Sequence, residues 1–277
     1  MIETDEIVIF NAPRNVEFKK FIYKLLSIGK LKKTYIDLLT NEDSLKEYDN
    51  AFTSNTAHAE RNYEVYEQLG DLTANKFIVC YMYNRFPKLK CSKAVKIVAR
   101  LRINYGSKQT FSKIADELGF WNYITAAEEE RNTKKKSLLE DSFEAFIGAT
   151  EYLLDTKIRN GVGYAIVYDI LAKIFDDINI SLRYEDLFDA KTRIKELFDH
   201  YGKDNIGVLK YEETKNMDTK LTTSILYQEY NGKRIMLAEG ISSLKADAQQ
   251  KSAQIGLRKM KSMGFNKPVD EIYNEFV

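Results

Sequence analysis

The scarcity of proline sets the first limit on what this chain can fold into. Only three prolines, Pro13, Pro87 and Pro268, occur in 277 residues. Because proline interrupts the interior of a helix, long helices can run unbroken over most of the sequence. Apolar residues recur at helical spacing in VEFKKFIYKLLSIGKL and in GYAIVYDILAKIFDDI. The sequence therefore predicts an all-helical first part that ends near Ile180.

Polar breaks separate the predicted helices of this part. One helix is expected from about residue 59 to residue 83, and two more are split at Tyr105-Gly106-Ser107. The charged run at 128–136 lacks apolar periodicity and is interpreted as a solvated loop or a helix end. In SLLEDSFEAFIGATEYLL, Gly148 costs about 1 kcal/mol against alanine. Close helix packing is the expected reason for this glycine.

The pattern of apolar residues in the sequence changes after Tyr184. DAKTRIKELFDHYG is a predicted helix with Asp189 as its N-cap. IGVLKYEETK, KLTTSILYQEY and KRIMLAEG are short, partly alternating runs that are typical of strands. Asn231-Gly232, between the last two runs, is a hairpin turn signal. With a final helix in SLKADAQQKSAQIGLRKMKSM, the order predicts a compact α+β domain.

We therefore expect a first domain over 1–183, a second over 187–265 and a tail over 266–277. Two cysteines, Cys80 and Cys91, form no disulfide framework and indicate reduced thiols. The start, MIETDEIVIF, has acidic residues where a signal peptide has basic ones. No run approaches the ~18 apolar residues of a membrane span. These patterns predict a cytoplasmic or otherwise intracellular protein with no signal peptide or transmembrane segment.

Carboxylates at helical spacing are the main chemical signal. Glu64, Glu67 and Asp71 stand at i, i+3 and i+7 in NYEVYEQLGD, and Asp141 and Glu144 stand at i and i+3 in EDSFEAF. If the two helices lie antiparallel in contact, four of these acids converge, and a cation is needed to neutralise them. Such oxygen ligands suit Mg²⁺ or Mn²⁺, which commonly work on phosphates. The alternative is that each cluster is a solvated helix face.

Several motifs resemble the ribonuclease III family. NYEVYEQLGD is similar to its signature N-x-E-x-L-E-F-L-G-D, and EDSFEAFIGA is similar to its D-x-F-E-A motif. AFTS at 51–54 stands where the family has A-[FL]-T-H-x-S, without the histidine, and DAKTRIKELF resembles the opening of its double-stranded-RNA-binding domain. The resemblance covers about 18–265. It implies an all-α ribonuclease III domain followed by a small α+β (α-β-β-β-α) double-stranded-RNA-binding domain.

The resemblance also implies a reaction and its residues. One or two Mg²⁺ ions per active site, with Mn²⁺ as the alternative, would activate a water that attacks the phosphorus of double-stranded RNA. Products would carry 5′-phosphate and 3′-hydroxyl ends with short 3′ overhangs. Glu64 matches a further catalytic acid beside the metals. The residues that match the metal-site acids are Glu67, Asp71, Asp141 and Glu144.

The implied partners are double-stranded RNA and a second copy of the chain, with no membrane and no DNA. The second domain departs from the family at two positions: Ala246 stands in a usual lysine position, and the usual histidine of the loop between the first two strands is missing. The residues expected to contact RNA are Lys191, Lys195, Lys220, Lys245 and Lys251.

Gln68 departs from the family, which usually has a phenylalanine here that is buried in the partner subunit. Tyr63 and Tyr66 are expected to supply the buried contact instead, with Gln68 hydrogen-bonded across the two-fold axis. The alternative is a weak dimer that is completed on RNA.

Two other functions compete with the endonuclease. One is a non-catalytic double-stranded-RNA-binding protein on the same scaffold; retention of all four metal-site acids argues against it. The other is a metal phosphohydrolase acting on small substrates, which the predicted C-terminal domain disfavours.

Overall fold

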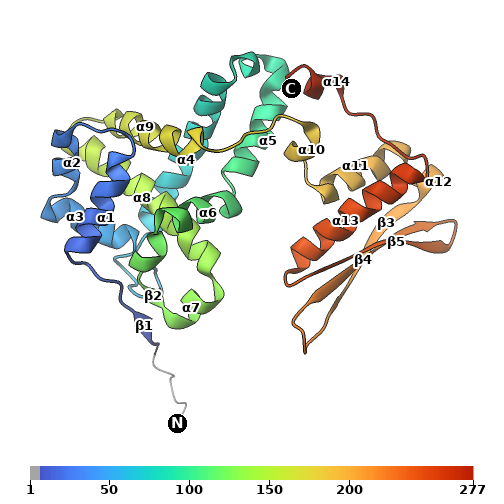
Figure 1. The fold of residues 1–277 in the computed structure, drawn as a ribbon, viewed down its shortest axis with the longest axis horizontal. Coiled ribbons are helices and arrows are strands. Elements are labelled where there is room, and N and C mark those ends of the chain that lie inside the picture. Colours follow the sequence, from blue (N-terminus) through green and yellow to red (C-terminus); the bar gives the residue numbers. More distant parts are fainter. Residues whose placement is uncertain (1–6, 277) are drawn as a thin grey trace, which may run out of the picture. The chain divides into compact units, whose positions relative to one another are not determined.

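Helices dominate the first part of the chain in the computed structural model, which describes residues 7–276 (Figure 1). By its contacts, one unit ends at Ile180 and a second begins at Ser181. In the first unit, β1 (Ile9–Phe10) pairs antiparallel with β2 (Ala126–Ala127). Short 3₁₀ helices lie at Pro87–Leu89, Ser92–Ala94 and Phe120–Tyr123. The α-helices are α1 (Val16–Ser27), α2 (Lys33–Leu39), α3 (Glu42–Ala51), α4 (Glu64–Arg85), α5 (Val95–Tyr105), α6 (Lys108–Leu118), α7 (Glu128–Thr133), α8 (Lys135–Lys157) and α9 (Val162–Asp176).

The long helices α4 and α8 lie side by side in the first unit (Figure 1). A Cβ atom placed on Gly70 of α4 would lie 1.7 Å from the Glu144 carbonyl oxygen of α8. One placed on Gly148 of α8 would lie 2.0 Å from the Tyr66 carbonyl oxygen of α4. Real Cβ atoms essentially never approach another atom within 3.0 Å. The prediction that Gly148 serves close helix packing is therefore confirmed.

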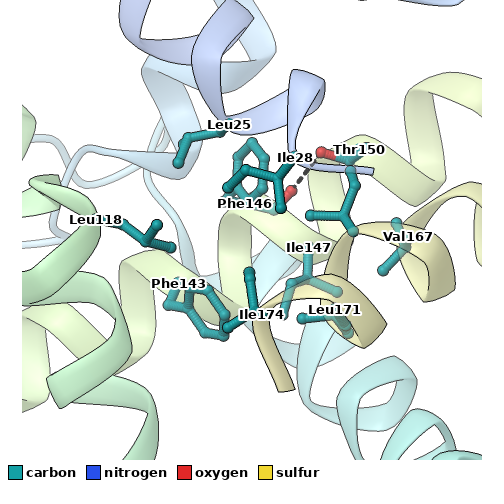
Figure 2. A pocket seen from close by; sticks show the side chains of 11 residues that line it. Leu25, Ile28, Leu118, Phe143, Phe146, Ile147, Thr150, Val167, Leu171 and Ile174 are labelled. Atoms are coloured by element: carbon teal, nitrogen blue, oxygen red, sulfur yellow. Dashed lines mark hydrogen bonds between the residues drawn. The ribbon is translucent and has the colours of Figure 1, made fainter. Parts of the chain in front are cut away.

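Apolar side chains from α1, α8 and α9 form a core on another side of α8 (Figure 2). Phe143, Phe146 and Leu171 are among the residues around a void of only about 10 Å³. Thr150 lies in the same core, and its hydroxyl donates to the Phe146 carbonyl oxygen at 2.7 Å, so this buried polar group is satisfied. A void of this size cannot hold a substrate, and the region is core.

The start of α4 differs from the prediction, because the helix begins at Glu64 rather than near residue 59. Side chains satisfy the backbone before that point. His58 Nδ1 accepts from the Arg61 amide at 3.0 Å, and Asn62 Nδ2 donates to the His58 carbonyl oxygen at 3.0 Å. The Asn62 side chain then accepts from the Glu64 amide at 3.0 Å. Such local bonds offer the chain an alternative to the helix.

The second unit has the predicted α-β-β-β-α order. The strands β3 (Val208–Lys215), β4 (Thr222–Tyr230) and β5 (Lys233–Ser242) form an antiparallel sheet in that order. The main helices, α11 (Ala190–Tyr201) and α13 (Lys245–Ser262), pack together, and a shared apolar core includes Ile194, Leu226 and Met260. The shorter helices are α10 (Tyr184–Leu187), α12 (Lys203–Ile206) and α14 (Glu271–Asn274).

Two local predictions for this unit are confirmed. The Asp189 side chain accepts from the Thr192 amide at 3.0 Å and so caps α11. Asn231 and Gly232 have φ values of 50° and 70°, the left-handed conformation that a two-residue hairpin turn requires.

The membrane prediction can be compared with the structure in part. Among residues 7–276, no helix is both long and apolar enough to cross a membrane. The expectation of no signal peptide rests partly on residues 1–6, which lie outside the described residues.

Candidate active site

The five carboxylates singled out from the sequence line one open cleft of about 750 Å³. Glu64, Glu67 and Asp71 come from α4, and Asp141 and Glu144 come from α8. The close glycine-mediated packing of the two helices brings both clusters together. The acids of the two motifs therefore line the same cleft.

Glu144 has the most strongly perturbed side chain of the cleft. It is only 6% exposed. Burial, followed by the negative charges of Glu140, Asp71 and Glu67, raises the pKa of its carboxyl to about 9. Burial also raises the pKa of Glu67 to about 7 and that of Asp141 to about 6. These groups crowd together without enough positive charge to balance them.

Neighbouring side chains orient three of the acids. Asn75 Nδ2 donates to Asp71 Oδ1 at 2.7 Å. The Tyr63 hydroxyl donates to Asp141 Oδ2 at 3.2 Å. Asn55, in the segment before α4, donates from its amide nitrogen to Glu64 Oε1. These three carboxylates are thus oriented by α4 and by the segment that precedes it.

The expectation that Tyr63 and Tyr66 form the dimer contact is wrong. Both are already buried within their own unit, at 5% and 8% exposed. The Tyr66 hydroxyl donates to Glu47 Oε2 at 2.6 Å, and that of Tyr63 contacts Asp141. The exposed face of α4 instead carries Val65, Gln68 and other residues described below.

Two charged residues of the cleft escaped the sequence analysis. Lys108, the first residue of α6, and Glu140 of α8 both line it, and they form an ion pair with each other. The position of Glu140 next to Asp141 was the only available signal for either residue. Nothing in the spacing of the sequence connects Lys108 to the acidic motifs.

No ready-made metal centre accompanies these acids. Within residues 7–276, no group of three or more His, Cys, Asp or Glu side chains is arranged so that it could hold a metal ion. The carboxylates share a cleft, but their ligand geometry is not preformed. The donor set itself, made of carboxylate oxygen atoms, suits a hard divalent cation. The four-carboxylate metal site stays a prediction.

The lysines predicted to contact RNA all belong to the second unit. Lys191 and Lys195 line a separate cleft of about 650 Å³ beside α11 and β3. Lys220 lies in the turn before β4 with a φ of 56°, and it is exposed. These positions leave the predicted RNA role untested.

Lys245 and Lys251, like Lys191, have partners within the unit. Lys245 Nζ lies 3.1 Å from Glu213 Oε2, and the Gln249 side chain also donates to Glu213. Lys251 Nζ donates to the Ile241 carbonyl oxygen at 2.8 Å. An RNA phosphate would have to compete with Glu213 for Lys245.

Comparison with known proteins gives matches to one family. Residues 64–153 match the family model of the ribonuclease III domain. The chain is 42% identical over 265 residues to a protein named ribonuclease 3 in Invertebrate iridescent virus 6, with 91% of this chain and 90% of the relative covered. It is 27% identical over 269 residues to ribonuclease 3 of Desulfotalea psychrophila, with 95% and 99% covered. Among solved structures, the ribonuclease III nuclease domain of Campylobacter jejuni has a TM-score of 0.43 and 23% identity, and the match covers 57% of this chain and 99% of that one.

The chain belongs to the ribonuclease III family. It is a ribonuclease III-type endoribonuclease, and its family acts on double-stranded RNA and generally depends on a divalent metal ion. The resemblance inferred from the sequence motifs is thereby confirmed.

Proposed function

We propose that this protein cuts both strands of duplex RNA in a reaction that depends on Mg²⁺, with Mn²⁺ as the alternative ion. Glu67, Asp71, Asp141 and Glu144 would hold one or two ions. The observation that carries the proposal is Glu144, a buried carboxyl with a pKa of about 9 among other acids. A bound cation would replace the proton of this group and balance the charge of the carboxylate. When bound, the metal supplies an activated water and stabilises the leaving oxygen.

The other roles in this proposal belong to the chain's own side chains. Tyr63 holds Asp141 and Asn75 holds Asp71, so each ligand keeps its orientation as an ion draws the acids together. Glu64 supports the site from the rim, anchored by Asn55. Attack at phosphorus with departure of the 3′-oxygen leaves a 5′-phosphate and a 3′-hydroxyl.

Cleavage of both strands with short 3′ overhangs requires two active sites, which we assign to a homodimer. The support is an exposed stripe on α4 at i, i+4 and i+7, made by Val65, Leu69 and Leu72, with Gln68 exposed beside it. We name these four residues the α4 stripe. It lies on the helix that carries three of the cleft acids, so a second copy packed there would bring two clefts close together.

Incubation of the full chain with a long RNA duplex, analysed on a sizing gel, tests the proposal. Mg²⁺ should give short duplex products, and a chelator should abolish them. A DNA duplex of the same sequence should stay intact, because an A-form helix is recognised by its shape and 2′-hydroxyls. An RNA duplex that is bound but never cut would favour the non-catalytic alternative, and equal cutting of DNA would defeat the assignment of substrate.

A further inference from the structure

Lys108 is the one basic side chain among the described residues that line the acidic cleft. Its ammonium group pairs with the Glu140 carboxylate. The two partners differ in exposure, because the Lys108 side chain is 51% exposed and that of Glu140 is 14% exposed. The acid is therefore largely covered, whereas the lysine is open to anything that enters the cleft.

The origin of Lys108 in the fold also separates it from the acids. It comes from the first turn of α6, whereas the acids come from α4 and α8. A lysine ammonium has three donors. It can keep one bond to Glu140 and still donate to a second anion. Lysine binds phosphate oxygens as a point charge, without the fixed geometry that arginine demands.

We propose that Lys108 contacts a phosphate of the RNA strand bound in the cleft, and that Glu140 is the positioning residue that holds its ammonium group there. This inference rests on the proposed function, since the phosphate belongs to the RNA substrate. The carboxylates that line the cleft repel the RNA phosphates, whereas Lys108 and bound cations attract them. Lys108 thereby gives the strand a fixed contact beside the cluster.

A simpler role would explain the same ion pair. Lys108 could serve only to neutralise Glu140, an acid additional to the proposed metal ligands. The two roles differ in a double-mutant cycle. If Lys108 only neutralises Glu140, removing both charges restores wild-type behaviour. If it contacts phosphate, the double variant is as impaired as the loss of the lysine alone.

The experiment compares K108Q, E140Q and the double variant K108Q/E140Q in duplex RNA cleavage over a range of salt concentrations. The matched control is K113Q, which removes the same charge from an exposed lysine of the same helix that pairs with Glu117 at 3.7 Å. Loss of one charged hydrogen bond to phosphate should raise KM about ten- to hundredfold in K108Q and in the double variant. The salt slope of kcat/KM should fall by about one in both.

K113Q should behave like the wild type, and E140Q should keep the wild-type salt slope because the lysine remains. A double variant restored to wild-type KM would overturn the phosphate contact, as would a K108Q variant that matches K113Q. Failure of the proposed function is distinct, because wild-type protein would then cut no RNA duplex at all.

Discussion

Replacement of Gly148 by alanine should separate the two helices that carry the acids. The new Cβ would lie 2.0 Å from the Tyr66 carbonyl oxygen and 2.8 Å from the Gly70 amide nitrogen. Ordinary contacts begin at 3.4 Å, so the helices must move apart by about 1.4 Å, the difference from 2.0 Å. Neither obstructing atom can rotate away, because both belong to a helical backbone. Overpacking costs about 1–3 kcal/mol, and the better helix propensity of alanine returns about 1 kcal/mol. Because the obstructing atoms are rigid backbone, the overpacking cost lies at the upper end of this range, about 3 kcal/mol, and we expect a net loss of about 2 kcal/mol in the free energy of unfolding.

Urea unfolding followed by Trp121 fluorescence measures this change. Trp121 is the single tryptophan and lies in the first unit, so its signal reports that unit. RNA cleavage should also fall, by about a hundredfold, because a shift of 1 Å between reacting groups can have that effect. Gly256→Ala is the control; its Cβ would meet only the side-chain ends of Leu226 and Ile194 in the second unit, and the Trp121 transition should not shift. An unchanged or higher unfolding midpoint for Gly148→Ala would refute the packing argument.

Three further outcomes follow from the site and the surfaces. Val65→Lys places a charge in the α4 stripe and should convert a dimer of about 64 kDa, twice the 32.1 kDa chain, to a monomer in sedimentation. Val95→Lys, at an apolar position of similar exposure on α5, should leave the dimer intact. Equal masses for both variants would contradict a dimer interface at the α4 stripe. Glu213→Gln should free Lys245 from its ion pair and tighten the binding of duplex RNA by the full chain. The control is Glu212→Gln, which removes the same charge from a neighbouring residue paired with Arg234 and should tighten binding less. Identical affinities for the two variants would show that net charge alone matters. The pKa of Glu144 is raised in the folded chain. Without metal, the folded chain therefore binds more protons than the unfolded chain between about pH 4 and pH 9. Its free energy of unfolding should fall as pH rises through this range. In thermal unfolding, Mg²⁺ should then stabilise the protein more at pH 8 than at pH 6. The opposite order would show that these carboxylates do not bind the metal.

Local signals explain what could be predicted from the sequence. The spacing of Glu67 and Asp71, and of Asp141 and Glu144, depends only on helical periodicity, so the convergence of these acids followed from two amphipathic helices in contact. Asp189 as a cap and Asn231-Gly232 as a turn depend on a few neighbouring residues. Such features are determined by residues close together in the sequence, and the structure contains them.

The missed features depend on tertiary contacts. The pairing of Lys108 with Glu140 results from the packing of α6 against α8, which no spacing reveals. Tyr63 directly precedes α4 and Tyr66 lies on it, and both are buried. Periodicity cannot tell residues buried within the subunit from residues buried by a partner. The β1–β2 pair, with two residues in each strand, is too short to leave a periodic pattern.

We propose that the four acids Glu67, Asp71, Asp141 and Glu144 form one metal-dependent catalytic site. Glu144→Gln tests it most directly, because glutamine keeps the shape of the side chain and removes its charge. The measurement is single-turnover cleavage of an RNA duplex in Mg²⁺, with duplex binding measured on the same protein. We predict that the cleavage rate falls by more than about a hundredfold while binding stays within a few-fold of wild type. Cleavage at a near wild-type rate by the glutamine variant would contradict the account.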